Sequence, residues 1–430
     1  MSAARPVRRR SLPRSHEGAP SEPWGNGAQR HGGSVKWFVV PLLALLAAAV
    51  HAAPFKVLLL ERADDPRLER SRTERAYLGH PGGPAADGID VALKEAQFEL
   101  DAAGASVTLE RGAAADAAAA RSAAANAQKA GAAAIVADLP ADWLLAAADA
   151  STLPLLNIGE AADRLRERDC RARVLHLAPS ERMRSDALAQ TLVSRRWSQV
   201  LLLTGPSPLD AERSAVAQAS IKRYGLKLVA AKPFKLSADP RERDLANPLL
   251  LTSANSGAYD VVWVVDSDGE FARSLPYRTA LPRPVVGDAG LVALAWQAQF
   301  ERFGAPQVSR RFMKATGRPM ASPDWVAWLA GKAIAAAAIV AQDTTKGAAK
   351  AAPASLAAAF AKALPMLELD GSKGTPMSFR GWDGQLRQPM LLTDGQGVIA
   401  MAPAEGVLHP KNNLDTLGAD APEKLCKATP

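Results

Sequence analysis

The sequence lacks the residue patterns that usually carry metal binding or cofactor chemistry. Its histidines, among them His80, His176 and His409, are scattered without metal-ligand spacing. The run Asp266–Gly269 starts like a calcium loop, but the later ligands and the closing Glu are missing. The glycines around Gly82 do not match the dinucleotide-binding fingerprint. These absences argue against an enzyme, and no cofactor or metal is expected.

A catalytic nucleophile is equally hard to find. Gly205–Leu209 lies at a predicted strand-to-helix turn, but it lacks the closing Gly of a nucleophile elbow. Ser207 followed by Pro208 instead predicts an N-cap with Pro at the first helical position. His176 lies inside an apolar run and is predicted to be a structural histidine. A secreted α/β enzyme stays open as an alternative, which turnover of an alcohol or an ester would revive.

The N-terminus reads as a targeting segment. Residues 1–36 have almost no apolar pattern, and residues 37–50 form an uncharged apolar run that is too short for a bilayer span of about 20 residues. The small residues that follow predict a secretory signal cleaved after Ala52. A start at Val35 would give a compact signal peptide. The alternative is an N-terminal membrane anchor.

The positive charge of the chain belongs mostly to this segment. The formal net charge is +8, and residues 1–52 carry seven basic against two acidic residues, which leaves about +3 for the mature chain. A near-neutral surface removes the main support for nucleic-acid binding.

Only two cysteines are present, Cys170 and Cys426. Both remain in the exported chain, where thiols tend to oxidise. We predict that they pair and attach the C-terminal tail to the charged segment around Cys170. The alternative is two free thiols.

Strands and helices alternate on both sides of the segment 153–180, which predicts two α/β halves with parallel sheets. The expected strands are 55–60, 105–110, 132–136, 153–158, 174–177, 200–203, 226–230, 261–265 and 284–286. The expected helices are 84–100, 113–130, 141–148, 181–197, 208–224, 241–251 and 325–341. Residues 61–83 are expected to form a polar loop, residues 346–353 a linker, and the C-terminal part short hairpin strands.

Polar residues follow the ends of several predicted strands. Ligands of open parallel sheets bind at these ends, so two facing sheets would bring the residues to one cleft. The candidate ligand-binding residues are Arg62, Asp138, Glu160, Asp266 and Asp288, with Trp143 as an apolar or cation-binding wall. The alternative is that these loops are simply solvated, above all the charge run 61–75.

The chain resembles the type I periplasmic substrate-binding proteins of ABC transporters, of the branched-chain amino acid class. Within that class it looks like the subfamily associated with PQQ-dependent alcohol dehydrogenase systems. The segments that carry this resemblance are LPLLNIGEAADRLR, DCRARVLHLAPS, ALAQTLVSRRW, WQAQFERFGAPQVSRRF and SPDWVAWLAGKAI.

The resemblance implies two lobes, each a mostly parallel sheet flanked by helices, with a ligand cleft between them. Three crossings are expected near Pro179, Arg318 and Lys346. The expected division is a signal segment at 1–52, a first lobe of 53–179 plus 319–345, a second lobe of 180–318 plus 346–403, and a tail of 404–430.

The resemblance also bears on the ligand. Amino-acid binders of this class hold the ligand carboxylate with small hydroxyl residues after the third and fourth strands, but 138–142 and 159–162 have none. Asp288 occupies the place of the acid that pairs the ligand amine. We therefore expect a neutral or cationic small molecule, linked to alcohol oxidation.

The expected function is capture of a small solute in the periplasm for an ABC permease. A PQQ-dependent dehydrogenase system is a further expected partner, and nucleic acid is not. The alternative is a periplasmic sensory or accessory protein that uses the same cleft without a permease.

Overall fold

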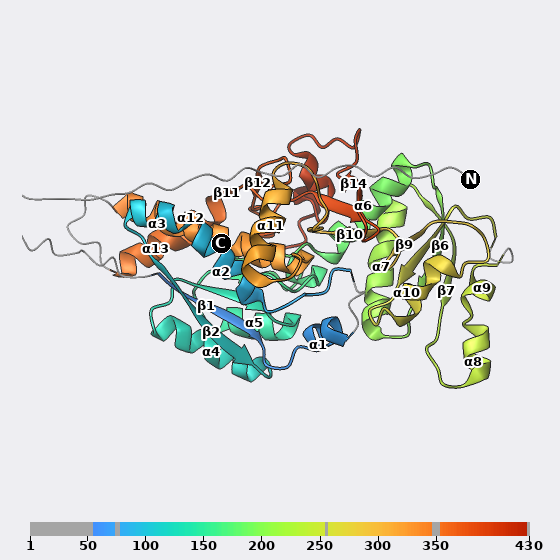
Figure 1. The fold of residues 1–430 in the computed structure, drawn as a ribbon, viewed down its shortest axis with the longest axis horizontal. Helices are drawn as coiled ribbons and strands as arrows, with labels where there is room; N and C mark the ends of the chain where they lie inside the picture. Colours follow the sequence, from blue (N-terminus) through green and yellow to red (C-terminus); the bar gives the residue numbers. More distant parts are fainter. Residues whose placement is uncertain (1–54, 74–77, 254–256, 346–352, 428–430) are drawn as a thin grey trace, which may run out of the picture. The chain divides into compact units, whose positions relative to one another are not determined.

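The computed structural model describes residues 55–73, 78–253, 257–345 and 353–427. The predicted signal segment, its cleavage after Ala52 and the alternative start at Val35 lie outside these residues, as does the crossing expected near Lys346. The described part contains two parallel sheets flanked by helices, which confirms the predicted α/β class (Figure 1).

The first sheet has five parallel strands in the order β2-β1-β3-β4-β5. The strands are β1 (Phe55–Arg62), β2 (Val107–Ala114), β3 (Ala134–Asp138), β4 (Leu155–Asn157) and β5 (Val174–His176). The central strand β3 is buried along its whole length, because helices cover both faces of the sheet. Each strand lies close to an apolar run expected from the sequence.

Side chains of β1 alternate between two apolar layers. Val57 and Leu59 face a cluster that contains residues of α2 and α12, whereas Leu58 and Leu60 face residues of α4 and α5. The helices are α2 (Ala85–Glu95), α4 (Ala117–Lys129), α5 (Ala141–Asp149) and α12 (Ser322–Thr345). Helix α12 is long and apolar enough to cross a membrane, but most of it is buried against its neighbours, as in a core helix.

Close packing of α2 on α12 depends on Gly88. A Cβ at this position would lie 2.5 Å from the carbonyl oxygen of Asp324, which is backbone and cannot move aside. The two helices therefore approach more closely than larger residues would allow.

The second sheet has four parallel strands in the order β7-β6-β8-β9. They are β6 (Gln199–Thr204), β7 (Lys227–Pro233), β8 (Val261–Val265) and β9 (Val285–Gly287). One face packs on α6 (Glu181–Ser194) and α7 (Pro208–Arg223), and the other on a cluster that includes Phe234, Tyr259 and Phe271. The second predicted half thus has the expected sheet.

Several elements differ from the sequence-based expectation. The expected helix 241–251 is split into α8 (Pro240–Leu245) and α9 (Pro248–Leu251), because Pro248 has no N–H and Asn247 caps a new helix. The expected helix 84–100 breaks at Ala96 into α2 and α3 (Gln97–Ala103). The expected loop 61–83 contains α1 (Pro66–Thr73).

The segments after the second sheet return to the first one. Phe312 of α11 (Ala305–Thr316) and Phe360 of α13 (Pro353–Ala363) lie in the same apolar cluster as β1. This packing differs from the expected division, which assigned residues 180–318 and 346–403 to the second lobe. The physical reason is that these helices supply the aromatic side chains that complete the first core.

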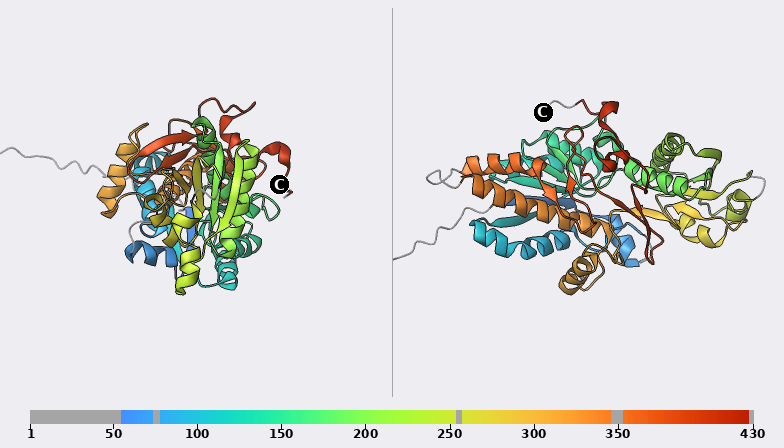
Figure 2. Two further views of the ribbon diagram at one scale, coloured as in Figure 1. Left: turned by 90° about the vertical axis from the view of Figure 1, so that its right-hand side faces the viewer. Right: turned by 90° about the horizontal axis from the view of Figure 1, so that it is seen from above.

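A further sheet is antiparallel and follows the second parallel sheet in the chain. It consists of β10 (Val292–Leu294), β13 (Met390–Thr393) and β14 (Val398–Ala402). Beside it, Gln388 Nε2 donates to the carbonyl of Leu177 at 2.7 Å. The strand β14 lies beside α6 (Figure 2). Cys170 and Cys426 form a disulfide, which confirms the predicted pairing.

Candidate functional site

The carboxyl ends of the first sheet bring polar residues together at one edge. Glu61 of β1 lies in register with Asp138 of β3, and Ala137 lies in register with Asn157 of β4. Because the strands are parallel, the loops that follow them leave the sheet on the same side. Arg62, Asp138 and Glu160 therefore lie at the same edge of this sheet.

Asp138 is neutralised by an arginine from α1. Arg67 Nη2 lies 2.8 Å from Asp138 Oδ1 and 2.6 Å from Asp65 Oδ2. Burial lowers the pKa of Arg67, but the two carboxylates outweigh burial and hold that pKa above its ordinary value. Asp138 therefore does not offer a free negative charge to a ligand.

Gly159 makes room for this ion pair. A Cβ at this position would lie 1.8 Å from Asp138 Oδ1, so any side chain must displace the carboxylate. We expect Gly159→Ala to lower the free energy of unfolding by about 1–3 kcal/mol, measured by urea denaturation. The matched control is Gly381→Ala, where a Cβ meets no heavy atom within 4 Å and no loss is expected. Equal stabilities of the two variants would contradict this account of the pair.

The loop after β4 is held by its own side chains. Asn157 Oδ1 accepts from the backbone N–H of Glu160 at 2.9 Å, and Glu160 Oε1 accepts from that of Ala162 at 2.9 Å. His176 is buried, and its Nδ1 lies 3.0 Å from Asn157 Nδ2. Burial lowers the pKa of His176 well below its ordinary value, in keeping with a structural, uncharged histidine.

A buried arginine underlies the same loop. Arg166 donates to Gln385 Oε1 at 2.9 Å and to the carbonyls of Glu160, Ala162 and Ala178 at 3.0, 3.1 and 2.8 Å. Burial lowers its pKa to about 10, so it stays protonated at neutral pH. Arg166 thus joins the loop after β4 to Ala178, beside the crossing expected near Pro179. It also joins this loop to Gln385, which is 219 residues away in the sequence.

Arg62 differs from these arginines. Its Nε is buried and has no hydrogen-bond partner, and no carboxylate among the described residues lies within 4 Å of its guanidinium. Burial, followed by the charge of Arg67, lowers the pKa of Arg62. The side chain lines a pocket of about 300 Å³ at the ends of β1 and β2.

The ends of the second sheet form a separate polar group. Ser207 and Asp210 make the reciprocal capping box of α7, which confirms the predicted N-cap. Asp210 Oδ1 also accepts from the backbone N–H of Ser267 at 2.6 Å, and the hydroxyls of Ser207 and Ser267 are 2.9 Å apart. These bonds fix the loop after β6 against the loop after β8.

Asp288 is paired inside the protein. Arg213 of α7 donates to its two carboxylate oxygens at 2.6 and 3.0 Å, and also lies 3.2 Å from Glu181 Oε1. Asp288 Oδ2 accepts in addition from the backbone N–H of Asp266 at 2.7 Å. The carboxylate expected to meet a ligand amine already holds a guanidinium.

Asp266 is almost fully buried, and only one of its oxygens is bonded. Its Oδ2 accepts from the backbone N–H of Ala272 at 2.9 Å, whereas its Oδ1 has no partner. Burial raises the pKa of this carboxyl, and the charges of Asp288 and Asp210 add to the effect. Asp266 thus organises its own loop and leaves one acceptor unused.

Comparisons with known proteins were made for sequence and for structure. No family model matches the sequence, and no curated protein matches it. Three solved structures illustrate the structural matches. A periplasmic binding protein from Burkholderia mallei has a TM-score of 0.63 at 13% identity, covering 88% of this chain and 99% of that one.

A branched chain amino acid ABC transporter periplasmic ligand-binding protein from Burkholderia xenovorans LB400 has a TM-score of 0.63 at 13% identity, over 80% of this chain and 94% of that one. A solute binding protein of an ABC transporter from R. palustris, in complex with benzoate, has a TM-score of 0.57 at 14% identity, over 84% of this chain and 100% of that one. The chain has the fold of type I periplasmic binding proteins. At such identities the likeness establishes the fold alone.

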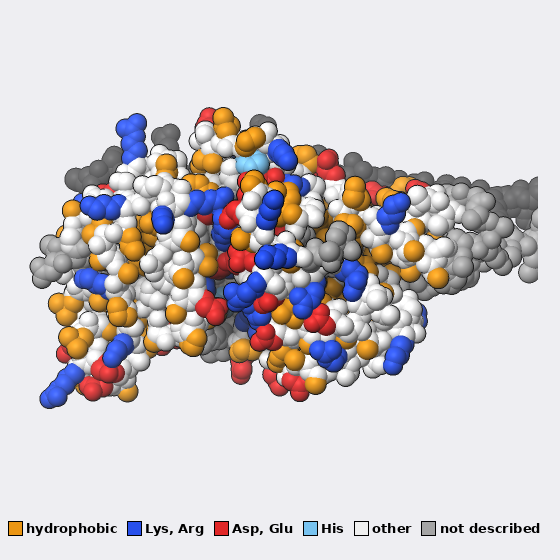
Figure 3. All heavy atoms as spheres, turned by 180° about the vertical axis from the view of Figure 1, so that it is seen from behind, with side chains coloured by type: hydrophobic (Ala, Val, Ile, Leu, Met, Phe, Trp, Pro, Cys, Tyr) orange, Lys and Arg blue, Asp and Glu red, His pale blue; other side chains and the backbone are white. Residues whose placement is uncertain are grey.

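This binding-protein fold places the candidate residues in two groups. Arg62 and Asp138 end strands of the first sheet and Glu160 follows one. Asp266 and Asp288 follow strands of the second sheet. Charged side chains of both signs lie next to one another over the middle of one face of the molecule (Figure 3). Trp143 is partly buried in the apolar layer of α4 and α5.

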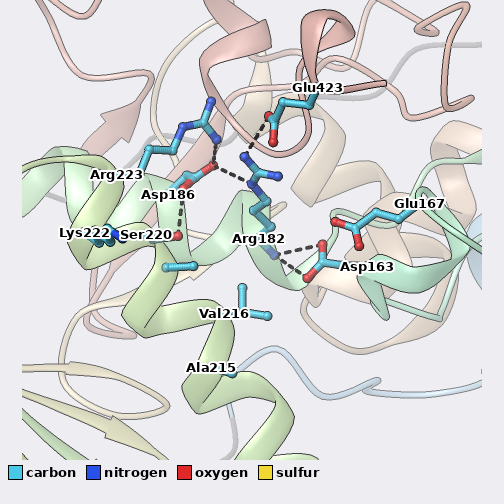
Figure 4. A pocket seen from close by; sticks show the side chains of 11 residues that line it. Asp163, Glu167, Arg182, Asp186, Ala215, Val216, Ser220, Lys222, Arg223 and Glu423 are labelled. Carbon is cyan, nitrogen blue, oxygen red and sulfur yellow. Dashed lines mark hydrogen bonds and ion pairs between the residues drawn. The ribbon is translucent and has the colours of Figure 1, made fainter. Parts of the chain in front are cut away.

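A pocket of about 730 Å³ lies beside the segment near Pro179 that was expected as the first crossing (Figure 4). Four of its charged residues form ion pairs: Arg182 Nη2 lies 2.8 Å from Glu423 Oε1, and Arg223 Nη1 lies 2.9 Å from Asp186 Oδ2. Asp163 accepts from the backbone N–H of Arg182, and burial raises the pKa of Asp163 to about 6. These contacts join η1 (Asp163–Leu165) and the C-terminal tail to α6, and α6 to α7.

Sequence reasoning missed the arginines of the site. Arg67, Arg166 and Arg213 lie in a predicted loop, a charged run and a predicted helix, and none carries a motif. The sequence did contain one signal for them, the excess of acids at strand ends. Acids that become buried there need cationic partners, and arginines can supply these. Among the described residues no group of His, Cys, Asp and Glu is placed to hold a metal ion.

Proposed function

We propose that this protein is the substrate-binding component of an ABC transporter, capturing a small solute between two lobes. The observation that carries the proposal is a pair of parallel sheets, each with a pre-arranged polar group at its carboxyl edge, in a binding-protein fold. Open α/β sheets bind ligands at such edges, and lobe closure would bury the ligand and present a surface to a permease. No bond is made or broken in this function, so the protein is not an enzyme.

The finer features follow from the resemblance and from the sequence. The protein would act in the periplasm after removal of the signal segment at Ala52, with an ABC permease as its partner. A link to a PQQ-dependent alcohol oxidation system is part of the proposal. Arg62, Asp138, Glu160, Trp143, Asp266 and Asp288 are its candidate ligand-binding residues.

The ion pairs of the strand-end acids change which ligand charge is expected. A neutral or cationic ligand was expected because strand-end acids would repel a carboxylate, but Asp138 and Asp288 are paired with Arg67 and Arg213. Proteins with this fold were solved with leucine and with benzoate, so the fold accommodates carboxylates. The paired acids therefore no longer count against an anionic ligand here.

Thermal-shift screening of the mature chain from Ala53 tests the proposal. The panel contains alcohols, aldehydes, amines, amino acids, aromatic acids and quinone cofactors. A ligand present at 100 times its Kd should stabilise the protein by about 2.7 kcal/mol and raise Tm accordingly. Small-angle scattering should then show a smaller radius of gyration, as lobe closure requires. A panel without any stabilising solute would overturn the proposal.

A pull-down with an ABC permease separates transport from sensing. Binding that strengthens with ligand supports the transporter role. Ligand binding without permease binding would favour the sensory or accessory alternative.

A further inference from the structure

The pocket at the ends of β1 and β2 is lined by charges of both signs. Glu61, Asp65, Arg62 and Arg111 contribute two carboxylates and two guanidinium groups, so their formal charges sum to zero. A bound anion would meet the two acids, and a bound cation would meet the two arginines. The lining of this pocket therefore suits an uncharged molecule better than an ion.

Two of these four groups keep hydrogen-bonding capacity that the protein does not use. Arg62 Nε is buried and has no acceptor, although a guanidinium carries five N–H donors. Glu61 Oε1 accepts from the backbone N–H of Ala85 at 3.0 Å, and no further hydrogen bond to this carboxylate comes from the described residues. Burial raises the pKa of Glu61, and the charge of Asp138 adds to the effect. Neighbouring residues at the end of β1 thus provide a donor and an acceptor that both need a partner.

The other two charged groups of the pocket are engaged inside the protein. Asp65 accepts from Arg67 Nε at 2.9 Å and from Arg67 Nη2 at 2.6 Å. Arg111 Nη2 lies 2.5 Å from Asp90 Oδ2. Asp65 and Arg111 therefore set the charge balance of the pocket, whereas Glu61 and Arg62 are the groups that can bind a solute directly.

Hydroxyl groups match this pair of binding groups. A hydroxyl both donates and accepts, whereas an ammonium only donates and a carboxylate only accepts. A molecule with several hydroxyls can accept from the guanidinium with one and donate to the carboxylate with another. Hydrogen bonds to charged groups are stronger than those between neutral groups, so each of these contacts favours binding.

We propose that this pocket binds a small uncharged polyol, with one hydroxyl accepting from Arg62 and another donating to Glu61. The carbon chain of the polyol would pack against the apolar part of the lining, which consists of Leu68, Pro84 and Ala113. The pocket volume of about 300 Å³ lies at the lower end of the range of small-molecule sites, in keeping with a small solute. This inference rests on the proposed solute-binding function and names its ligand class.

The first experiment varies the number of hydroxyls on one carbon chain. Calorimetric titration of the full mature chain gives the Kd of xylitol, 1,2-pentanediol and 1-pentanol, and ribitol and mannitol are added to vary the stereochemistry. We expect the best polyol to bind at least about tenfold more tightly than the diol, because it satisfies both charged groups at once. We expect no binding of 1-pentanol at about 10 mM, since a single hydroxyl leaves one of the two groups unpaired.

The second experiment adds a charge to the same chain. Xylonate carries a carboxylate and 1-amino-1-deoxyxylitol carries an ammonium, and each should bind at least about tenfold more weakly than the best polyol because the pocket repels one sign at either end. Pentanamide is included because a neutral amide also has a donor and an acceptor. It should bind more weakly than the polyol, since it offers only one polar group.

Variants assign the binding to the two groups. Arg62→Met removes the donors and should weaken polyol binding by about 10- to 100-fold, and Arg62→Lys should recover part of the loss. Glu61→Gln keeps an oxygen for the N–H of Ala85 but removes the charge, and should weaken polyol binding by about tenfold. The two variants should also change the charge preference in opposite directions: Glu61→Gln favours xylonate, and Arg62→Met favours the amine. A purely structural role would not produce this opposite change.

The matched control is Arg121→Met, which replaces an exposed arginine of α4 that does not line the pocket. It should change the Kd of the polyol by less than about threefold. Urea denaturation of each variant at the wild-type concentration would show that a loss of binding is not a loss of folding.

Three results would overturn the inference: no binding of xylitol, ribitol or mannitol at about 10 mM, tighter binding of a charged analogue or of pentanamide than of the best polyol, or unchanged polyol binding by Arg62→Met and Glu61→Gln. The proposed function is judged separately by the wider panel. A protein that binds another solute there but no polyol would lose this inference and keep its function.

Discussion

Replacing Arg166 with Met is expected to lower the free energy of unfolding by about 1–3 kcal/mol. The methionine fills a similar volume but donates no hydrogen bond. Gln385 Oε1 would then be left without a donor, and the carbonyls of Glu160, Ala162 and Ala178 would each lose one of two hydrogen bonds. Because these acceptors belong to the strand-end loop, the first crossing and the returning segment, the variant should loosen all three.

Urea denaturation measures the loss, and hydrogen exchange locates it. Exchange should rise in 157–166, 176–178 and 385–388 before it rises elsewhere. Arg166→Lys should recover little, since one ammonium cannot reach acceptors on several sides. The control is Arg168→Ala, whose side chain is 76% exposed and whose loss should stay within about 0.5 kcal/mol. Similar stabilities of the Met and Ala variants would refute the structural role assigned to Arg166.

The sheets could be predicted from the sequence because their inner strands are almost fully buried. Segments such as Ala134–Asp138 and Val261–Val265 read as short apolar runs with polar ends, and burial on both faces demands such runs. The positions of the strand ends followed directly, and so did the acids Asp138, Asp266 and Asp288. This part of the candidate site depends only on local sequence.

The partners of those acids could not be predicted in the same way. Arg213 reaches Asp288 from a helix 75 residues away, and Arg67 reaches Asp138 over 71 residues. No local pattern records such a pairing, because a charged residue on a helix looks the same whether it is solvated or bridges to another loop. The expected ligand class therefore rested on acids whose charge is compensated in the folded chain.

The division of the chain after residue 290 has a similar explanation. The helices α11 and α13 were not predicted, since they follow a loop-like segment and an Ala/Lys linker. Their aromatic residues Phe312 and Phe360 complete the first core only once β1 and α12 are in place. Tertiary packing, rather than local propensity, decides where these helices lie.

The C-terminal tail is held at two places that differ in kind. Hydrogen bonds fix its first part: the backbone N–H of Gly418 donates to Asp186 Oδ2 at 2.9 Å, and Tyr224 donates to the carbonyl of Thr416 at 2.6 Å. The disulfide fixes its last part to Cys170, which follows β4. Reduction should therefore release the end of the tail while the part beside α6 and α7 stays bound.

Replacing both Cys170 and Cys426 with Ser is expected to lower the free energy of unfolding by about 2–5 kcal/mol. The disulfide joins residues 256 positions apart, so its loss frees a large part of the unfolded chain. Hydrogen exchange should increase in 421–427 and around residue 170, while 413–418 remains protected. Reductant should destabilise the wild type to a similar extent and leave the double variant unchanged, because that variant has no disulfide to reduce. If the wild type unfolds at the same urea concentration with and without reductant, the tail is held by its hydrogen bonds and the disulfide contributes little.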